Sequence, residues 1–225
     1  MTKIKSLLIG ASGLVGGEIF KCLHERDQDI TLFTRKPSHN LSNKHKEINV
    51  DFENLNRVDF PHFDHVYIAI GMKLKTAELI HIKRNKRNEF YRVDHDIVLN
   101  VAQRAFESGA RSISIVSAIG ADMNSRNFYL QTKGKIENSI KQIGYEKVVF
   151  AQPSHLLGSR PNNKIGIEVP VIELGAKIID PIMVGPFSNL RFIKASSVAR
   201  AMVNTLNDNS ENLTRLRFKD FKNYQ

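Results

Sequence analysis

The fold is decided by residues 4–16, which read IKSLLIGASGLVG. The segment Ile4–Ile9 is mostly apolar and β-favouring, and this predicts a buried strand. Glycines follow at positions 10, 13 and 16, and an apolar pattern with helical spacing runs from Gly13 to His24. A strand, a glycine-rich turn and a helix in immediate succession are typical of a phosphate-binding site.

Each glycine of this turn has a separate physical role in a dinucleotide site. The chain must turn sharply at Gly10, a side chain at Gly13 would collide with a pyrophosphate, and Gly16 lets the helix approach the sheet. The free N–H groups and the positive end of the helix dipole then face the phosphates. A glycine-rich turn without a ligand is the alternative, but the flanking strand and helix favour a dinucleotide.

The rest of the chain alternates apolar runs with helical stretches. This succession predicts an α/β fold, a doubly wound, Rossmann-like parallel sheet with right-handed crossovers. Gly109 and Gly144 lie where helix C-caps are expected. The predicted strands are Ile30–Thr34, Glu47–Val50, Val66–Ile70, Ser112–Ser117 and Lys147–Gln152, and the predicted helices are Glu89–Gly109 and Tyr129–Ile143.

The pattern changes after Gln152. Five of the seven prolines lie between Pro153 and Pro186 and interrupt regular structure. A strand is expected at Arg191–Ile193, followed by a helix opened by Ser196 or Ser197. We interpret residues 1–225 as one dinucleotide-binding domain with a small C-terminal substrate cap, mainly within residues 153–190.

The end of the second predicted strand indicates which dinucleotide binds. The sequence there is Thr34-Arg35-Lys36, with no carboxylate for an adenosine 2′-hydroxyl. Because Arg35 can form paired hydrogen bonds with a 2′-phosphate, NADP(H) is favoured over NAD, and a basic surface turn is the alternative. Residues after two other strands are expected beside the same groove: Asp51 and Phe52 near the adenine, and Ala69, Ile70 and Gly71 at the end of the fourth strand.

Three side chains form a candidate catalytic group. Tyr129 and Lys133 are four residues apart, on one helix face and about 6 Å apart along its axis. Ser117 ends a predicted strand, at the edge where open α/β sheets bind ligands. A nearby cation would lower the pKa of the tyrosine, and the serine would hold a substrate oxygen. A solvent-facing Tyr–Lys pair is the alternative.

With these motifs in place, the sequence resembles a short-chain dehydrogenase/reductase, of the small atypical NAD(P)H-binding group that includes Tat-interactive proteins. The resemblance rests on LLIGASGLVGGEI, YRVDHDIVLNVAQRA, SIVSAIGADMNSRNFYLQTKGKIE, AQPSHLLGSR and SSVARAM, which together span most of the chain. It implies that Ser117, Tyr129 and Lys133 are catalytic. It also implies that Gly10, Ser12, Gly13, Leu14 and Val15 contact the phosphates, that Arg35 contacts the 2′-phosphate, and that Pro153 and Ser154 lie beside the nicotinamide.

The sequence departs from that family in two places. Gln152 stands where these proteins usually carry arginine, and a long basic stretch, Met72–Asn88, replaces a compact loop. We therefore keep two hypotheses. The first is an NADPH-dependent oxidoreductase that transfers hydride to or from a small carbonyl or alcohol; the second is a non-catalytic NADPH-binding sensor.

Composition limits other classes of function. The formal net charge is +10, and much of this excess lies between Lys73 and Arg87, where Glu78 is the acidic residue. Without interleaved aromatic residues, this stretch is interpreted as a solvated or anion-attracting face and not as a specific nucleic-acid site. No signal peptide, membrane span or membrane partner is expected, and the single cysteine, Cys22, forms no intrachain disulfide. A cytoplasmic location is therefore expected.

No metal site is expected either. His62 and His65 have a spacing that could ligate a metal, but no further cluster completes the set. Cys22 is interpreted as a packing residue, and His95 as a histidine on a helix surface.

Overall fold

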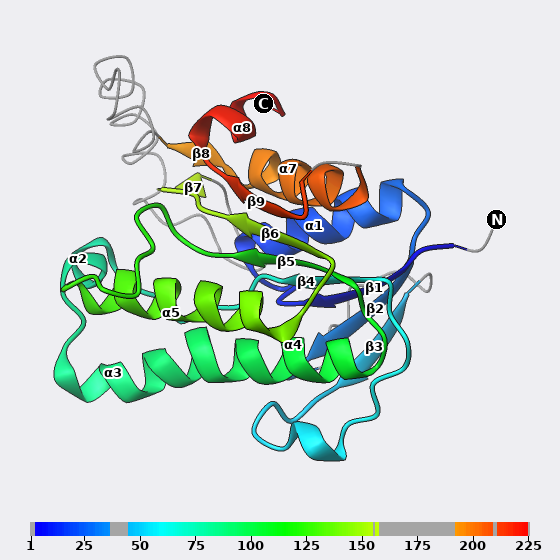
Figure 1. The fold of residues 1–225 in the computed structure, drawn as a ribbon, viewed down its shortest axis with the longest axis horizontal. Helices are drawn as coiled ribbons and strands as arrows, with labels where there is room; N and C mark the ends of the chain where they lie inside the picture. Colours follow the sequence, from blue (N-terminus) through cyan, green and yellow to red (C-terminus); the bar gives the residue numbers. More distant parts are fainter. Residues whose placement is uncertain (1–2, 37–44, 155, 158–191, 209–210, 225) are drawn as a thin grey trace.

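The computed structural model describes residues 3–36, 45–154, 156–157, 192–208 and 211–224. Within them, one parallel sheet has the strand order β3-β2-β1-β4-β5-β6-β9, and β7 and β8 form a separate parallel pair (Figure 1). This confirms the predicted doubly wound parallel sheet. The strands are β1 Lys5–Ile9, β2 Asp29–Thr34, β3 Lys46–Asn49, β4 His65–Ile68, β5 Ser112–Val116, β6 Lys147–Ala151, β7 Leu156–Leu157, β8 Ile193–Lys194 and β9 Leu213–Leu216.

Helices cover both faces of the sheet (Figure 1). Successive strand residues point to opposite faces, so Leu7 and Ile9 belong to one core and Leu8 to the other. Helices α4 and α5 pack on the first core, and α1 and α7 pack on the second. The helices are α1 Leu14–Glu25, α2 Thr76–Ile80, α3 Arg84–Tyr91, α4 Ile97–Glu107, α5 Phe128–Ile143, α7 Ala195–Asn207 and α8 Phe218–Lys222, with a 3₁₀ turn at Leu55–Arg57 and a π-helical turn at Arg92–Asp96.

The glycine turn fixes where α1 begins. Gly10 has φ +95°, a conformation that favours glycine, and a Cβ there would lie 2.5 Å from the Ala69 carbonyl oxygen. A Cβ at Gly16 would lie 2.0 Å from the Gly10 carbonyl oxygen. The backbone of α1 therefore packs directly against the turn, and the helix starts at the carboxyl end of β1.

Several predicted elements differ from the observed ones. The helix predicted at Glu89–Gly109 begins at Arg84 and is interrupted by the π-helical turn. The strand expected at Arg191–Ile193 is Ile193–Lys194, and the helix expected from Ser196 or Ser197 begins at Ala195. Strand β9 and helix α8 were not predicted. The predicted cap, residues 153–190, lies almost entirely outside the described residues.

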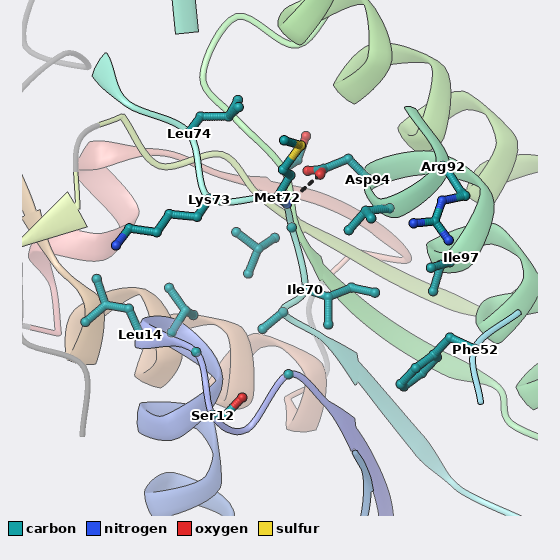
Figure 2. Close-up of a pocket in the computed structure, with 18 of the residues that line it drawn as sticks. Ser12, Leu14, Phe52, Ile70, Met72, Lys73, Leu74, Arg92, Asp94 and Ile97 are labelled. Atoms are coloured by element: carbon teal, nitrogen blue, oxygen red, sulfur yellow. Dashed lines mark hydrogen bonds between the residues drawn. The ribbon is translucent and has the colours of Figure 1, made fainter. Parts of the chain in front are cut away.

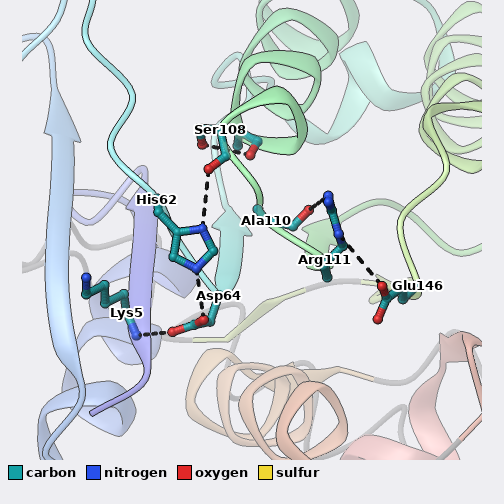
Figure 3. Close-up of polar contacts among 8 residues, drawn as sticks. Lys5, His62, Asp64, Ser108, Ala110, Arg111 and Glu146 are labelled. Atoms are coloured by element: carbon teal, nitrogen blue, oxygen red, sulfur yellow. Dashed lines mark hydrogen bonds and ion pairs between the residues drawn. The ribbon is translucent and has the colours of Figure 1, made fainter. Parts of the chain in front are cut away.

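A polar cluster ties the strands together at the amino ends of β1 and β4 (Figure 3). His62 lies between two acceptors: its Nδ1 is 3.3 Å from the Ser108 carbonyl oxygen, and its Nε2 is 3.2 Å from the Asp64 carboxylate. Asp64 also accepts a hydrogen bond from the Lys5 backbone N–H at 2.8 Å. Burial alone would raise the pKa of Asp64, but the Lys5 N–H and His62 outweigh it, so the pKa is lowered.

This lowered pKa predicts a pH-dependent contribution to stability. A carboxyl group with a lower pKa in the folded state stabilises the fold above its unfolded-state pKa, and this contribution is lost as pH falls through the folded-state value. Asp64→Asn should therefore lower the free energy of unfolding at pH 7, and the difference from the unmodified protein should shrink toward pH 3. Urea unfolding at both pH values measures it, with Asp59→Asn, at an exposed position, as the control. A difference that is constant with pH would contradict this assignment.

Candidate active site

A cavity of about 1150 Å³ lies at the carboxyl ends of β1, β4 and β5 (Figure 2). Figure 2 shows Ser12 and Leu14 of the glycine turn on one side, Phe52 on another, and Asp94 above them. The structure therefore brings together most of the residues predicted from the sequence. Those that line the cavity are Gly10, Ser12, Gly13, Leu14, Val15, Arg35, Asp51, Phe52, Ala69, Ile70, Gly71, Ser117, Tyr129, Lys133, Pro153 and Ser154.

Three predicted cofactor residues are not among the residues that line this cavity: Gly16, Thr34 and Lys36. Gly16 packs against the Gly10 carbonyl instead. The Thr34 hydroxyl donates to the Glu47 carboxylate at 2.9 Å. Arg35 is thus the cation of the Thr34-Arg35-Lys36 segment that borders the cavity.

The glycine turn has the chemistry that a pyrophosphate requires. The N-cap of α1 is Gly13, which offers no side-chain cap, and the first turn contains no acidic residue. The first backbone N–H groups of a helix have no partner within the helix, so they remain available to an anion. A Cβ at Gly13 would lie 3.1 Å from the Gly10 carbonyl oxygen, so the turn leaves little room for a side chain there. These residues fit the phosphates of a dinucleotide.

Arg35 and Asp51 differ in their availability to a ligand. Arg35 pairs with no carboxylate within the described part of the chain. Asp51 is engaged locally, because its carboxylate accepts hydrogen bonds from the Glu53 N–H at 3.0 Å and from the Asn54 amide at 2.6 Å. The guanidinium is therefore free to bind a phosphate.

Lys133 forms a buried ion pair that was not predicted. Its Nζ lies 2.8 Å from Asp94 Oδ1, and the two side chains are 7% and 3% exposed. The other Asp94 oxygen accepts a hydrogen bond from the Met72 backbone N–H at 2.7 Å, drawn as a dashed line in Figure 2. Asp94 therefore joins α5 to the segment that follows β4. One sequence signal was available: Asp94 precedes Val98 by four residues, so it lies on the apolar face of the predicted helix.

The electrostatic environment of Tyr129 differs from the prediction. Burial raises its pKa, Lys133 lowers it, Asp94 raises it again, and the net direction is upward. The predicted lowering of this pKa is therefore wrong, because Asp94 compensates the charge of Lys133 and desolvation of the phenol opposes its ionisation. Burial also opposes the charge of Lys133, but Asp94 outweighs it, so the pKa of Lys133 is raised.

A second buried network holds Ser117. Its hydroxyl donates to Glu137 Oε1 at 2.6 Å, and the Gln152 amide donates to the same oxygen at 2.8 Å. Arg215 of β9 forms an ion pair with the other Glu137 oxygen at 3.3 Å, and Arg217 donates to Gln152 Oε1 at 3.1 Å. The cations near position 152 thus come from β9, which was not predicted, and from the residue that follows it. Glu137 itself follows Lys133 by four residues, so it shares a helix face with it.

The remaining candidates have structural roles. His95 is buried and not on the helix surface as expected: it stacks on Tyr91 and lies 2.8 Å from Asp96. His62 is part of the polar cluster at the amino ends of β1 and β4, at the opposite end of the strands from the cavity. Cys22 packs against the core beside α7. Within the described residues, no group of His, Cys, Asp or Glu is suited to a metal ion.

Residues 6–214 match the model of the "NAD dependent epimerase/dehydratase family". The chain belongs to that family. The match agrees with the predicted relationship to atypical short-chain dehydrogenases/reductases, and it supports an NAD-dependent enzyme of the oxidoreductase or epimerase type that binds a nicotinamide cofactor.

Two solved structures are similar in fold. MoeE5 in complex with UDP-glucose and NAD has a TM-score of 0.68 and 16% identity, over 96% of this chain and 79% of that chain. Human epimerase family protein SDR39U1 with NADPH has a TM-score of 0.61 and 14% identity, over 94% and 72%. One neighbour thus carries NAD and the other NADPH.

Curated relatives include two fungal proteins named "Protein FMP52, mitochondrial". The one from Saccharomyces cerevisiae is 39% identical over 33% of this chain and 32% of its own length. The one from Candida albicans is 26% identical over 70% of this chain and 69% of its own length. These names contradict the cytoplasmic location expected from the sequence. That expectation rested on the low cysteine content and on the lack of a recognised targeting segment.

The ion pair between Asp94 and Lys133 yields a stability prediction. Asp94→Asn leaves a buried ammonium without its counter-charge, which should lower the free energy of unfolding by about 3–5 kcal/mol. Lys133→Met should be destabilising for the converse reason, and the double variant should recover part of the loss because neither charge remains. Urea unfolding of all four proteins measures this. Additive losses in the double variant would contradict a direct interaction.

Proposed function

We propose that the protein is an NADPH-dependent oxidoreductase that acts on a small carbonyl or alcohol with Ser117, Tyr129 and Lys133 as catalytic residues. One observation carries the proposal: these three side chains line the same cavity as the glycine turn and Arg35. A cofactor held by the turn would supply or accept a hydride. The side chains of this chain would manage the proton and the orientation of the substrate.

The preference for NADPH rests on Arg35. It borders the cavity and has no carboxylate partner among the described residues, so it is free to bind a 2′-phosphate. Thr34 is engaged by Glu47, and Lys36 does not border the cavity. Within the Thr34-Arg35-Lys36 segment, selectivity therefore depends on Arg35.

Tyr129 is suited to donate a proton. Burial keeps its pKa above the usual value, so the phenol is protonated at neutral pH. A protonated phenol can donate to the oxygen of a carbonyl as that oxygen gains negative charge. The net charge beside Tyr129 is small because Asp94 pairs with Lys133. Both features support the reductive direction.

The role that we propose for Ser117 differs from the one predicted from the sequence, which was to hold a substrate oxygen. A carboxylate accepts hydrogen bonds and cannot donate them, so the Ser117 proton is directed at Glu137. The serine oxygen then offers lone pairs to the cavity. Ser117 would therefore accept a hydrogen bond from a hydroxyl group and would not polarise a carbonyl.

The same contacts favour a second candidate function, a non-catalytic NADPH-binding sensor. In that role Lys133 would stay paired with Asp94, and Ser117 with Glu137, as structural contacts. The glycine turn and Arg35 would still be required. The two candidates therefore differ in their need for the Tyr129 hydroxyl.

Cofactor selectivity provides the first test. NADPH should bind more tightly than NADH, because a charge-assisted hydrogen bond contributes about 1.5–3 kcal/mol, roughly ten- to a hundredfold in affinity. Arg35→Ala should remove most of this difference and leave NADH affinity nearly unchanged. Lys36→Ala, which changes a neighbouring cation, serves as the control. Titration calorimetry with both cofactors measures the affinities, and equal affinities in the unmodified protein would overturn the assignment.

The Tyr129 hydroxyl distinguishes the two functions. Tyr129→Phe keeps the ring and removes the proton donor, so NADPH affinity should hardly change while carbonyl reduction falls by about 10²- to 10⁴-fold. A panel of aldehydes and ketones with NADPH, followed at the nicotinamide absorbance, measures the rates. If the unmodified protein turns over and Tyr129→Phe matches it, the mechanism is wrong. If NADPH binds tightly and no compound turns over, the sensor function is favoured.

A further inference from the structure

Four exposed cations lie on the segments that adjoin α2, and α2 carries an exposed apolar side chain at its end. Ile80, at the end of α2, is 78% exposed. Lys75 precedes α2, Lys83 and Arg84 open α3, and Arg126 precedes α5, and all four are exposed. The Asn127 amide donates to the Leu79 and Ile80 carbonyl oxygens at 2.9 and 3.0 Å, which joins these segments. We call Lys75, Ile80, Lys83, Arg84 and Arg126 the basic face.

Among the described residues, the cations of the basic face are not held in ion pairs. Lys3, Lys21 and Lys147 each form an ion pair with a carboxylate. None of the four cations of the basic face pairs with a carboxylate in the ranges that the structure describes. Glu78, the acidic residue within α2, is already engaged by Lys86 at 2.6 Å. The positive charge of this face is therefore only partly offset, by Glu78.

We propose that the basic face binds the surface of a membrane that contains anionic phospholipids. Lysine and arginine side chains attract anionic headgroups, and an exposed aliphatic side chain near them can enter the boundary with the acyl chains. Ile80 supplies that side chain, and Met123, on the loop before α5, is also 45% exposed. A nucleic acid would gain nothing from Ile80. Residues 72–88 contain no Phe, Tyr or Trp on which bases could stack.

The contact would be peripheral, and it departs from the sequence expectation that no membrane takes part. Within the described residues, no helix has the length and apolar character needed to cross a bilayer. Leu79, next to Ile80, lines the cavity, so the basic face adjoins the cavity rim. Neither Ile80 nor any of the four cations of the basic face lines the cavity. We therefore expect membrane binding to be independent of catalysis.

Vesicle co-sedimentation of the full chain tests this proposal. The protein should bind phosphatidylglycerol-containing vesicles and not pure phosphatidylcholine, and binding should weaken as salt increases. Lys83→Gln/Arg84→Gln should bind about 25-fold more weakly, at roughly fivefold per cation. The control, Lys46→Gln/Arg57→Gln, removes the same charge from exposed positions near β3 and the 3₁₀ turn and should bind as the unmodified protein does.

Ile80 separates membrane insertion from simple charge attraction. Ile80→Ser leaves the net charge unchanged, and it should weaken vesicle binding by about tenfold. Calorimetric NADPH binding should stay the same in every variant and thereby report an intact fold. Equal losses of vesicle binding in the basic-face and control double variants, or full binding by Ile80→Ser, would overturn the proposal. Tighter binding to duplex DNA than to anionic vesicles at the same salt would also overturn it, in favour of a nucleic-acid partner.

Discussion

The close approach of α1 to the end of β1 is the constraint on which the cavity depends. A Cβ at Gly16 would overlap the Gly10 carbonyl oxygen, and a Cβ at Gly10 would overlap the Ala69 carbonyl oxygen. These two contacts place the uncapped start of α1 beside the ends of β1 and β4. The partial positive charge at the start of the helix then faces the cavity at the carboxyl ends of the strands. Ser117 and the residues after β4 lie at the same ends.

Two buried carboxylates organise the other side of that space. Asp94 neutralises Lys133 and holds the Met72 backbone, whereas Glu137 directs the Ser117 hydroxyl and collects Gln152 and Arg215. Both carboxylates are acceptors only, so they fix where protons lie as well as where side chains point. The cavity is therefore lined by a phenol whose pKa is raised and by a serine whose proton is directed at Glu137.

Sequence patterns predicted the parts of the protein that depend on local spacing. Continuous apolar runs identified the central strands, and the glycine spacing identified the turn, because each follows from chain geometry. Contacts between distant segments were not accessible in this way. Asp94 and Glu137 lie on predicted helices, but their partners depend on tertiary packing, and the pKa of Tyr129 depends on both burial and Asp94. Strand β9 was missed because Leu213–Leu216 is short and contains an arginine that reaches a buried carboxylate.

A crystal structure with bound NADPH would show whether the glycine turn and the Tyr129 side of the cavity hold one dinucleotide between them. We expect pyrophosphate density over the N–H groups of Leu14 and Val15, the 2′-phosphate against Arg35, and the nicotinamide within reach of Tyr129. Density for the phosphates away from the start of α1, or a nicotinamide directed away from Tyr129, would contradict this expectation.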